Sequence, residues 1–308
     1  MNFYAPPPVI VADVFATVPD HLSKSGHPST WVDANHPGSK LGSFLEGPAF
    51  DRAGNLYVVD IPFGRVLRFA PDGTCEVAAE YDGWPNGLAI HRDGRIFIAD
   101  YRLGIMVLDP KTGQVSPVVT HCQSESFKGC NDLTFAGNGD LYFTDQGQTG
   151  VHDPSGRVYR LTAQGKLERL IDNGPSPNGL ALDPAEKVLY VAMTRANCMW
   201  HLPLKDGAVS KAGVFGYLPG IHGPDGLAVD EDGNLAVCHA RVGIVWLLSP
   251  LGEPLFRIQA RDGVSRLTNA AYGGDARKTL YICDSYGGRI LAAKLPVAGV
   301  QLYSHQLE

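Results

Sequence analysis

One phrase of about fifteen residues returns six times along this chain. Its copies begin at Glu46, Asn86, Asn131, Asn178, Asp225 and Asn269. Successive copies start 40, 45, 47, 47 and 44 residues apart. A period of about 40–50 residues is typical of the blades of a β-propeller, in which every repeat forms one small sheet.

The contents of each repeat agree with this period. In the first copy, short apolar or alternating stretches predict strands at Gly47–Asp51, Leu56–Asp60, Arg65–Phe69 and Glu76–Tyr81. Turn residues rich in Gly, Pro, Asp and Asn separate these stretches. Four antiparallel strands make one blade. The sequence therefore predicts an all-β chain that folds as a six-bladed β-propeller.

The last repeat provides three clear strands, so its fourth must come from elsewhere. We expect Val9–Val18 to pair with the last blade and close the ring, because this removes exposed sheet edges. Val300–Tyr303 is the competing segment. Pro19–Leu45 lacks a clear period and is expected to be a loop across one face. We expect residues 1–308 to form a single domain, with 1–45 supplying the closing strand and this loop.

Composition narrows the class of function. Hydrophobic residues make up 44% of the chain and the net charge is −6, which argues against a nucleic-acid partner. No apolar run reaches the roughly 18 residues that span a bilayer, and no basic segment precedes the first apolar stretch. The six cysteines form no C-x-x-C pair and are expected to be reduced thiols. These features predict a cytoplasmic protein, a monomer or small homo-oligomer, without a membrane partner.

The first residue of each phrase has a special position. The first strand of a blade lines the central channel, so these six residues should converge at one mouth of it. All six carry side-chain oxygens, although Asn and Asp also begin turns for local reasons. Carboxylate and amide oxygens suit Ca²⁺, whereas Zn²⁺ more often recruits His or Cys. The pattern predicts one divalent ion, with Ca²⁺ favoured and Mg²⁺, Mn²⁺ or Zn²⁺ as alternatives.

The loops that follow the second strands should surround the same mouth and contact a substrate. The candidates for substrate contact in these loops are Tyr101, Gln146, Arg195 and His239, with Asn86 and Asn131 from the ring of strand starts. A hydrogen-bonded packing role is the alternative for His239.

The ordered set of motifs resembles the SMP-30/gluconolactonase/LRE-like family. The resemblance runs from about Phe44 to Leu295. Its carriers are L-E-G-P-A-F at 45–50, N-D-L with F-T-D at 131–145, S-P-N-G-L-A at 176–181 and G-P-D-G-L-A-V-D at 223–230. The resemblance implies a six-bladed propeller with one channel metal, and a hydrolase of sugar-acid lactones. Related propellers hydrolyse organophosphates.

The resemblance also implies roles for single residues. Glu46, Asn178 and Asp225 match the family's metal ligands, and Asp225 matches its proposed acid/base. Asn131 matches a residue that binds the metal in some members and the substrate in others. Where some sugar lactonases carry an Arg, this chain has Lys128-Gly129-Cys130, which puts gluconolactone itself in doubt.

These inferences predict a metal-dependent lactonase acting on a small molecule. In this mechanism, the metal stabilises charge on the carbonyl oxygen while water attacks. Either Asp225 or His239 would accept the proton, since coordination lowers the basicity of a carboxylate. The alternatives are an organophosphate or aryl-ester hydrolase on the same site, and a non-catalytic propeller that binds calcium or a partner.

Overall fold

The computed structural model describes residues 5–263 and 265–306, which fold almost entirely into β-sheet. The first repeat forms a sheet of β2 (Leu45–Phe50), β3 (Leu56–Asp60), β4 (Arg65–Phe69) and β5 (Cys75–Glu80). The second forms β6 (Pro85–Ile90), β7 (Ile96–Asp100), β8 (Gly104–Asp109) and β9 (Gln114–Val119). The third forms β12 (Cys130–Phe135), β13 (Leu141–Asp145), β14 (Gly156–Leu161) and β15 (Leu167–Gly174). Each is a four-stranded antiparallel meander, as its turn-separated strands predict.

The later repeats form two larger sheets. One contains β16 (Pro177–Leu182), β17 (Val188–Met193), β18 (Cys198–Lys205), β19 (Ala208–Val209) and β20 (Gly213–Tyr217). The other has eight strands in the order β21 (Leu227–Val229), β22 (Leu235–His239), β23 (Ile244–Leu248), β24 (Pro254–Ala260), β1 (Val9–Thr17), β27 (Arg289–Lys294), β26 (Thr279–Asp284) and β25 (Leu267–Gly273). A small hairpin joins β10 (His121–Cys122) to β11 (Glu125–Ser126).

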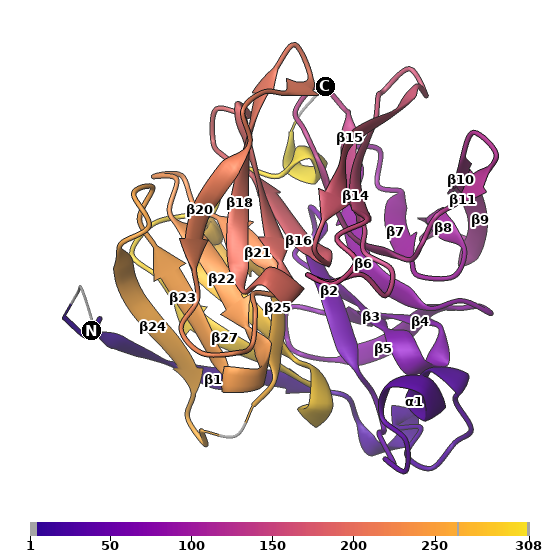
Figure 1. Ribbon diagram of the computed structural model, residues 1–308. Helices are drawn as coiled ribbons and strands as arrows, with labels where there is room; N and C mark the ends of the chain where they lie inside the picture. The colour runs from indigo at the N-terminus through magenta and orange to yellow at the C-terminus, as the bar shows by residue number, and fades with distance from the viewer. Residues whose placement is uncertain (1–4, 264, 307–308) are drawn as a thin grey trace.

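The inner strands meet around a common centre. In Figure 1, β2, β6, β16, β21 and β25 lie near the middle of the molecule, and β9 and β24 lie toward its periphery. The inner strands contact one another in a closed cycle, from β2 through β6, β12, β16, β21 and β25 back to β2. The fold is therefore propeller-like, with a central channel between the inner strands.

The hydrophobic core lies between neighbouring sheets. One cluster combines Phe97 and Ile105 of the second repeat with Leu133 and Phe143 of the third. Corresponding clusters join the other neighbouring repeats. Successive side chains of a strand point to opposite faces of its sheet. Both faces are buried, because a neighbouring sheet packs against each of them.

The N-terminal strand β1 pairs with the last repeat, as expected. Asp13–Thr17 runs antiparallel to Arg289–Ala292 of β27. The preceding part of β1 makes a second contact that the sequence did not indicate, because Val9–Ala12 pairs in parallel with Arg257–Ala260 of β24. A single strand therefore joins two consecutive repeats into the eight-stranded sheet. The competing segment Val300–Tyr303 forms no strand in this sheet.

The segment before β2 is not the plain loop that its sequence suggested. It contains the 3₁₀ turn η1 (Asp20–Leu22) and the helix α1 (Thr30–Asn35). The Ser29 side chain caps α1 by accepting a hydrogen bond from the Val32 amide, 3.3 Å away. Further 3₁₀ turns are η2 (Ile61–Phe63), η3 (Thr194–Ala196), η4 (Ala240–Val242), η5 (Asp275–Arg277), η6 (Ser285–Gly287) and η7 (Tyr303–His305). None of the helices in residues 5–263 and 265–306 has the length and apolar character that crossing a bilayer demands.

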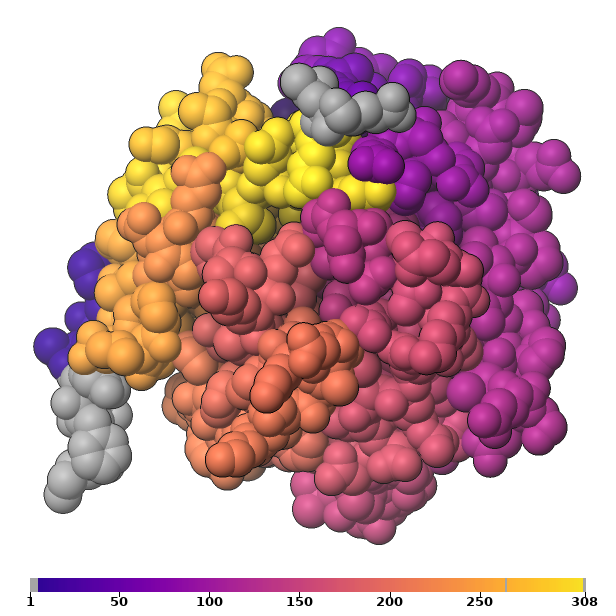
Figure 2. Space-filling model, turned by 90° about the horizontal axis from the view of Figure 1, so that it is seen from above, coloured from indigo at the N-terminus to yellow at the C-terminus, as the bar shows by residue number. Residues whose placement is uncertain are grey.

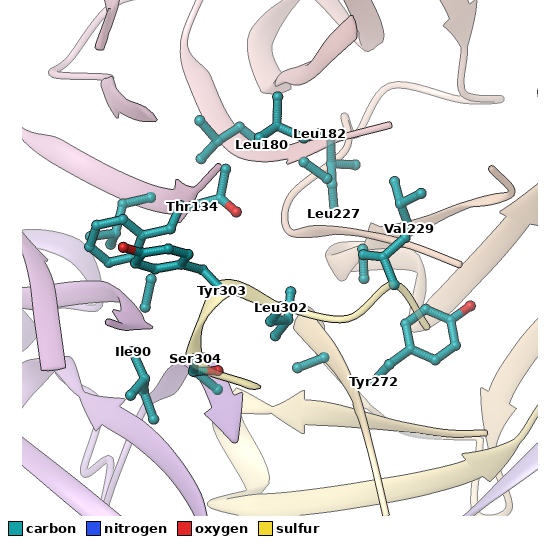
Figure 3. A pocket seen from close by; sticks show the side chains of 18 of the residues that line it. Ile90, Thr134, Leu180, Leu182, Leu227, Val229, Tyr272, Leu302, Tyr303 and Ser304 are labelled. Carbon is teal, nitrogen blue, oxygen red and sulfur yellow. The ribbon is translucent and has the colours of Figure 1, made fainter. Parts of the chain in front are cut away.

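The C-terminal segment lies over one end of the channel, which we call the far end. Figure 2 shows this face, with the C-terminal residues in yellow between the first and last repeats. Beneath them lies a pocket of about 360 Å³ lined mainly by apolar side chains of the inner strands. In Figure 3, Leu302 lies near the middle of the residues that line this pocket, and the Tyr303 ring lies beside Thr134. Val300–Tyr303 therefore covers the channel instead of completing a sheet.

Candidate functional site

The opposite end of the channel, where the inner strands begin, is called the mouth. The pairing of inner and second strands is irregular here. The register between β2 and β3 shifts between Glu46 and Ala49, and equivalent shifts lie between Cys130 and Leu133 and between Pro177 and Leu180. A β-bulge bends its strand and re-aims the side chains beside it. The repeat thus places its first polar residue at a bulge, where the side chain can face the channel.

Close approach of the inner strands explains the glycine that follows several of these residues. A Cβ on Gly47 would lie 2.7 Å from the Leu88 backbone nitrogen, and Gly47 has a φ of +57°. A Cβ on Gly179 would lie 2.5 Å from the Asp225 carbonyl oxygen. Contacts this short leave no room for a side chain. The E-G, N-G and D-G pairs in the sequence therefore reflect strands that meet at the channel axis.

A cavity of about 1250 Å³ opens at the mouth. It is lined by every residue predicted for the site except His239, namely Glu46, Asn86, Tyr101, Asn131, Gln146, Asn178, Arg195 and Asp225. Residues 147–152, which follow Gln146 in the loop after β13, also line it. Asn269, the sixth residue of the predicted ring, lines the far pocket instead.

Two carboxyl groups line this cavity, of which Glu46 is buried and Asp225 is half-buried. Burial raises the pKa of Glu46 well above its ordinary value, and the nearby Asp225 carboxylate raises it further. Burial also raises the pKa of Asp225 to about 7. A hydrogen bond with the Asn178 side chain and the charge of Arg195 act in the opposite direction. The site therefore concentrates negative charge that the surrounding side chains only partly compensate.

Asp132 is a third buried acid that the sequence analysis missed. Its Oδ2 accepts a hydrogen bond from Asn269 Nδ2 at 3.3 Å and its Oδ1 accepts one from the Leu133 amide at 2.9 Å. Burial raises its pKa to about 7, and its charge contributes to the raised pKa of both Glu46 and Asp225. The third repeat carries Asp132 where the first, second, fourth and fifth repeats carry Gly. This departure from the repeat is the sequence feature by which Asp132 could have been identified as a functional candidate.

Amide side chains form a chain of hydrogen bonds across one side of the cavity. Asn131 Nδ2 donates to Gln146 Oε1 at 3.0 Å, and Gln146 Nε2 donates to Ser176 Oγ at 3.0 Å. Because its nitrogen donates to Gln146, Asn131 has its oxygen available for a cation or a substrate donor. The network orients Asn131 and Gln146 together.

The donor set fits a hard divalent cation. Glu46 and Asp225 provide carboxylate oxygens, and Asn131 and Asn178 provide amide oxygens, which are ligand types that Ca²⁺ uses. Within the described part of the chain, no group of three or more His, Cys, Asp or Glu side chains could hold a metal ion. The candidate set contains only two such residues, Glu46 and Asp225, because its other two members are asparagines. The buried acids supply the physical reason for a cation, since ionised carboxylates in a dry site need a positive partner.

His239 belongs to the packing of the fifth repeat instead of the cavity. Its Nε2 bonds to the His222 carbonyl oxygen, and its Nδ1 accepts a hydrogen bond from Trp246 Nε1 at 3.4 Å. The ring is buried, and burial lowers its pKa. The structure places His239 outside the cavity lining, in agreement with the packing alternative. The sequence predicts that His239 ends a strand, but it does not determine the direction in which the imidazole ring points.

The aspartates that end other second strands also have structural partners. Asp60 accepts a hydrogen bond from the Phe44 amide at 2.8 Å and pairs with Arg65. Asp100 accepts a hydrogen bond from Tyr81 Oη at 2.8 Å, and Asp145 accepts one from the Gly129 amide at 2.8 Å. These carboxylates hold the segments around the mouth in place.

The basic residues near the mouth are arranged differently from the sugar-lactonase pattern. Lys128 donates to Ser155 Oγ at 2.9 Å and is absent from the cavity lining. Arg195, on η3 of the fourth repeat, lines the cavity. A guanidinium is therefore present, but a different blade supplies it.

Comparison with known proteins agrees with this fold. The family model described as the SMP-30/Gluconolactonase/LRE-like region matches residues 44–285. A lactonase, drp35, from Staphylococcus aureus is 32% identical over 233 residues, which is 71% of each chain. A gluconolactonase from Zymomonas mobilis is 31% identical over 275 residues, covering 78% of this chain and 76% of the relative.

A solved structure shows the same architecture. The gluconolactonase from Xanthomonas campestris superposes with a TM-score of 0.73 at 26% identity, covering 96% of this chain and 99% of its own. Since the family model spans well over half of the sequence and these relatives cover more than two thirds of it, the chain belongs to the SMP-30/gluconolactonase/LRE-like family.

Proposed function

We propose that this protein is a divalent-metal-dependent hydrolase that opens the ring of a small-molecule lactone, from a sugar acid or a related catabolic compound. The observation that carries the proposal is the pair of carboxyl groups, the buried Glu46 and the half-buried Asp225, that line an open cavity together with amide side chains. Relatives named lactonase and gluconolactonase support the same reaction class.

The metal is proposed to be held by Glu46, Asn131, Asn178 and Asp225, with Ca²⁺ favoured because all four donors are oxygens. When bound, a divalent ion supplies a positive charge that stabilises oxyanion character on the carbonyl group under attack. Asn131 and Gln146, fixed by their mutual hydrogen bond, are suited to orient the substrate. Arg195 adds a cationic donor at the rim for polar substituents or the carboxylate product.

Asp225 is the proposed proton acceptor. It lines the cavity, and burial raises its pKa to about 7. With the metal bound, the carboxylate oxygen of Asp225 that does not coordinate the ion would accept the proton of an attacking water. His239 is not proposed for this role, because both of its ring nitrogens have hydrogen-bond partners within the fold.

The architecture proposed with this function is one domain of six blades. The eight-stranded sheet counts as two blades that share β1, and the closed cycle of inner strands supports this count. The cytoplasm is the proposed compartment, since all six cysteines are free thiols. A monomer or small homo-oligomer is the proposed state.

The test is a panel of γ- and δ-lactones followed by acid release in a weakly buffered indicator, with and without EDTA. We expect turnover that EDTA abolishes and Ca²⁺ restores. Turnover confined to diisopropyl fluorophosphate or phenyl acetate would replace this proposal with an organophosphate or aryl-ester hydrolase. If no compound were hydrolysed under any metal condition, the non-catalytic alternative would stand.

A further inference from the structure

The cavity at the mouth has two unlike walls. The third and fourth repeats contribute a polar wall that includes Gln146, Gln148, Ser176 and Arg195. Facing the same space are the side chains of Trp31, Phe44, Ile61, Trp84 and Tyr101, which we call the apolar wall. These come from α1 and from the first and second repeats. A ligand that occupies the cavity must therefore match both kinds of surface.

The apolar wall is rigidly supported. Ser29 Oγ donates to the Pro62 carbonyl oxygen at 2.7 Å, which fixes the start of α1 to η2. The rings of Trp31 and Phe44 lie with their centroids 5.0 Å apart, and Asp60 holds the Phe44 amide at 2.8 Å. The wall is thus built into the scaffold and needs little ordering when a ligand binds.

The wall is also continuous with the hydrophobic core. Trp31 and Ile61 belong to the cluster between the first and second repeats, and Phe44 and Trp84 pack against it. Two polar groups on this side are engaged in hydrogen bonds. Tyr101 Oη accepts a hydrogen bond from Gln148 at 2.8 Å, and the Asn35 side chain donates to the Trp31 carbonyl oxygen at 2.9 Å. Substrate hydroxyls placed here would lose water with little compensation.

We propose that the apolar wall binds an alkyl or aryl substituent of the lactone, so that the preferred substrate is an alkyl- or aryl-substituted lactone instead of a fully hydroxylated one. This inference rests on the proposed lactonase function. The specificity element is α1, which precedes residues 44–285 matched by the family model. Trp31 is its principal contact, and Trp84, whose ring centroid lies 6.3 Å from that of Tyr101, supplies the contact from the second repeat.

A homologous series of lactones tests the substituent preference. We expect kcat/KM to rise from γ-butyrolactone through γ-hexalactone to γ-nonalactone, by about fourfold for each methylene that becomes buried. Glucono-δ-lactone should be a poorer substrate than γ-nonalactone. A preference for glucono-δ-lactone, or a flat response to chain length, would overturn the proposal.

Variants of the wall locate the effect. Trp31→Ala should lower kcat/KM for γ-nonalactone at least tenfold more than for γ-butyrolactone, and Trp84→Leu should act in the same direction. Trp200→Phe is the matched control, because Trp200 is half-buried on β18 and does not line the cavity. It should leave the series unchanged. Equal losses on all three lactones in Trp31→Ala and Trp84→Leu would overturn the assignment of the wall.

A binding measurement separates this inference from the proposed function. γ-Nonalactone added to the Ca²⁺-loaded protein should change the tryptophan fluorescence saturably, and Trp31→Ala should weaken that binding at least tenfold. Saturable binding of this kind without turnover would remove the lactonase proposal and leave the apolar wall supported. Turnover of γ-butyrolactone without preferential binding of γ-nonalactone would remove the wall and leave the lactonase proposal intact.

Discussion

The two ends of the central channel differ in chemistry although the same inner strands line both. At the mouth, where the strands begin, a cavity of about 1250 Å³ contains Glu46 and Asp225 among amide side chains. At the far end, where the strands finish, a pocket of about 360 Å³ is lined mainly by apolar residues and covered by 300–304. The repeat thus separates reactive polar groups from a packed apolar end over the length of one strand.

The same inner strand therefore contributes to the site at its start and to the packed core along the rest of its length. The bulges at the starts of β2, β12 and β16 let a polar side chain face the axis, whereas the regular part of each strand packs as ordinary β-structure. Closing the far end with the chain's own residues leaves the mouth as the end where ligand chemistry is concentrated. Asp132 lies near the boundary, since it lines the far pocket while its charge acts on the mouth acids.

The largest effect is expected from removing a carboxylate at the mouth. Glu46→Gln and Asp225→Asn should each weaken metal binding by at least about 100-fold, because even partners outside the coordination shell cost 10–100-fold. Turnover should be lost with the metal. Isothermal titration with Ca²⁺ and lactone hydrolysis at saturating Ca²⁺ would measure the two effects. Normal metal content and rates in both variants would show that the mouth is not the metal site.

At the far end, the expected effect is on stability instead of activity. Tyr303 is buried, and its ring contacts His91 and Phe135 with centroids 5.0 and 5.3 Å away. Tyr303→Ala should lower the free energy of unfolding by about 3 kcal/mol, as for other buried aromatic side chains. Urea denaturation would measure this. The exposed neighbour Gln301 provides the control, and Gln301→Ala should cost less than about 0.5 kcal/mol.

The contrast between the ends would fail if Tyr303→Ala, measured while folded, lost activity as severely as Asp225→Asn. We expect its kcat/KM to stay within about twofold of the unmodified protein. A change of no more than twofold would show that Tyr303 closes the far end of the channel without taking part in the reaction at the mouth.

The pH dependence of stability tests the acids without reference to turnover. In the metal-free folded protein, burial raises the pKa of Asp225 and of Asp132 to about 7, compared with 3.8 for an ordinary Asp. Between these values the folded protein binds more protons than the unfolded chain, so its stability falls as the pH rises. The loss should be on the order of 1.4 kcal/mol per pH unit for each carboxyl group.

Urea unfolding at pH 5, 6, 7 and 8 in EDTA would show this loss, and saturating Ca²⁺ should reduce it by binding the ionised carboxylates. Asp132→Asn should make the metal-free dependence shallower, because one of the titrating groups is removed. A metal-free protein that becomes more stable between pH 5 and pH 7 would contradict the picture of uncompensated buried acids.

Local pattern explains why so much of the fold was predictable. In the first repeat, β3 and β4 coincide with the predicted Leu56–Asp60 and Arg65–Phe69, and the flanking strands begin one or two residues earlier than predicted. Turns and two-residue alternation depend on only a few neighbouring residues. The strands of each repeat can therefore be predicted from that repeat alone. The oxygen-bearing strand starts were visible for the same reason.

Long-range contacts explain what was missed. The parallel pairing of β1 with β24 joins residues about 250 positions apart, and no local pattern indicates it. Trp31 reaches the cavity because Ser29 fixes α1 to Pro62, a contact that a segment without periodicity does not reveal. The role of Asp132 was not predictable from its own repeat, because its charge acts on the pKa of Glu46 in the first repeat and of Asp225 in the fifth.

The smallest effect on activity is expected at His239. Its Nδ1 lone pair accepts from Trp246 and its Nε2 bonds to the His222 carbonyl oxygen, so neither nitrogen is free to accept a proton from water. Because burial lowers its pKa, the ring stays neutral near physiological pH. His239→Asn should therefore leave the pH dependence of kcat/KM unchanged, although it should destabilise the fold by about 1 kcal/mol through the disturbed hydrogen bonds. Loss of the inflection on the acidic side of that profile in His239→Asn would instead return the ring to the role of base. Retention of the inflection would leave the mouth carboxylates as the groups that set it.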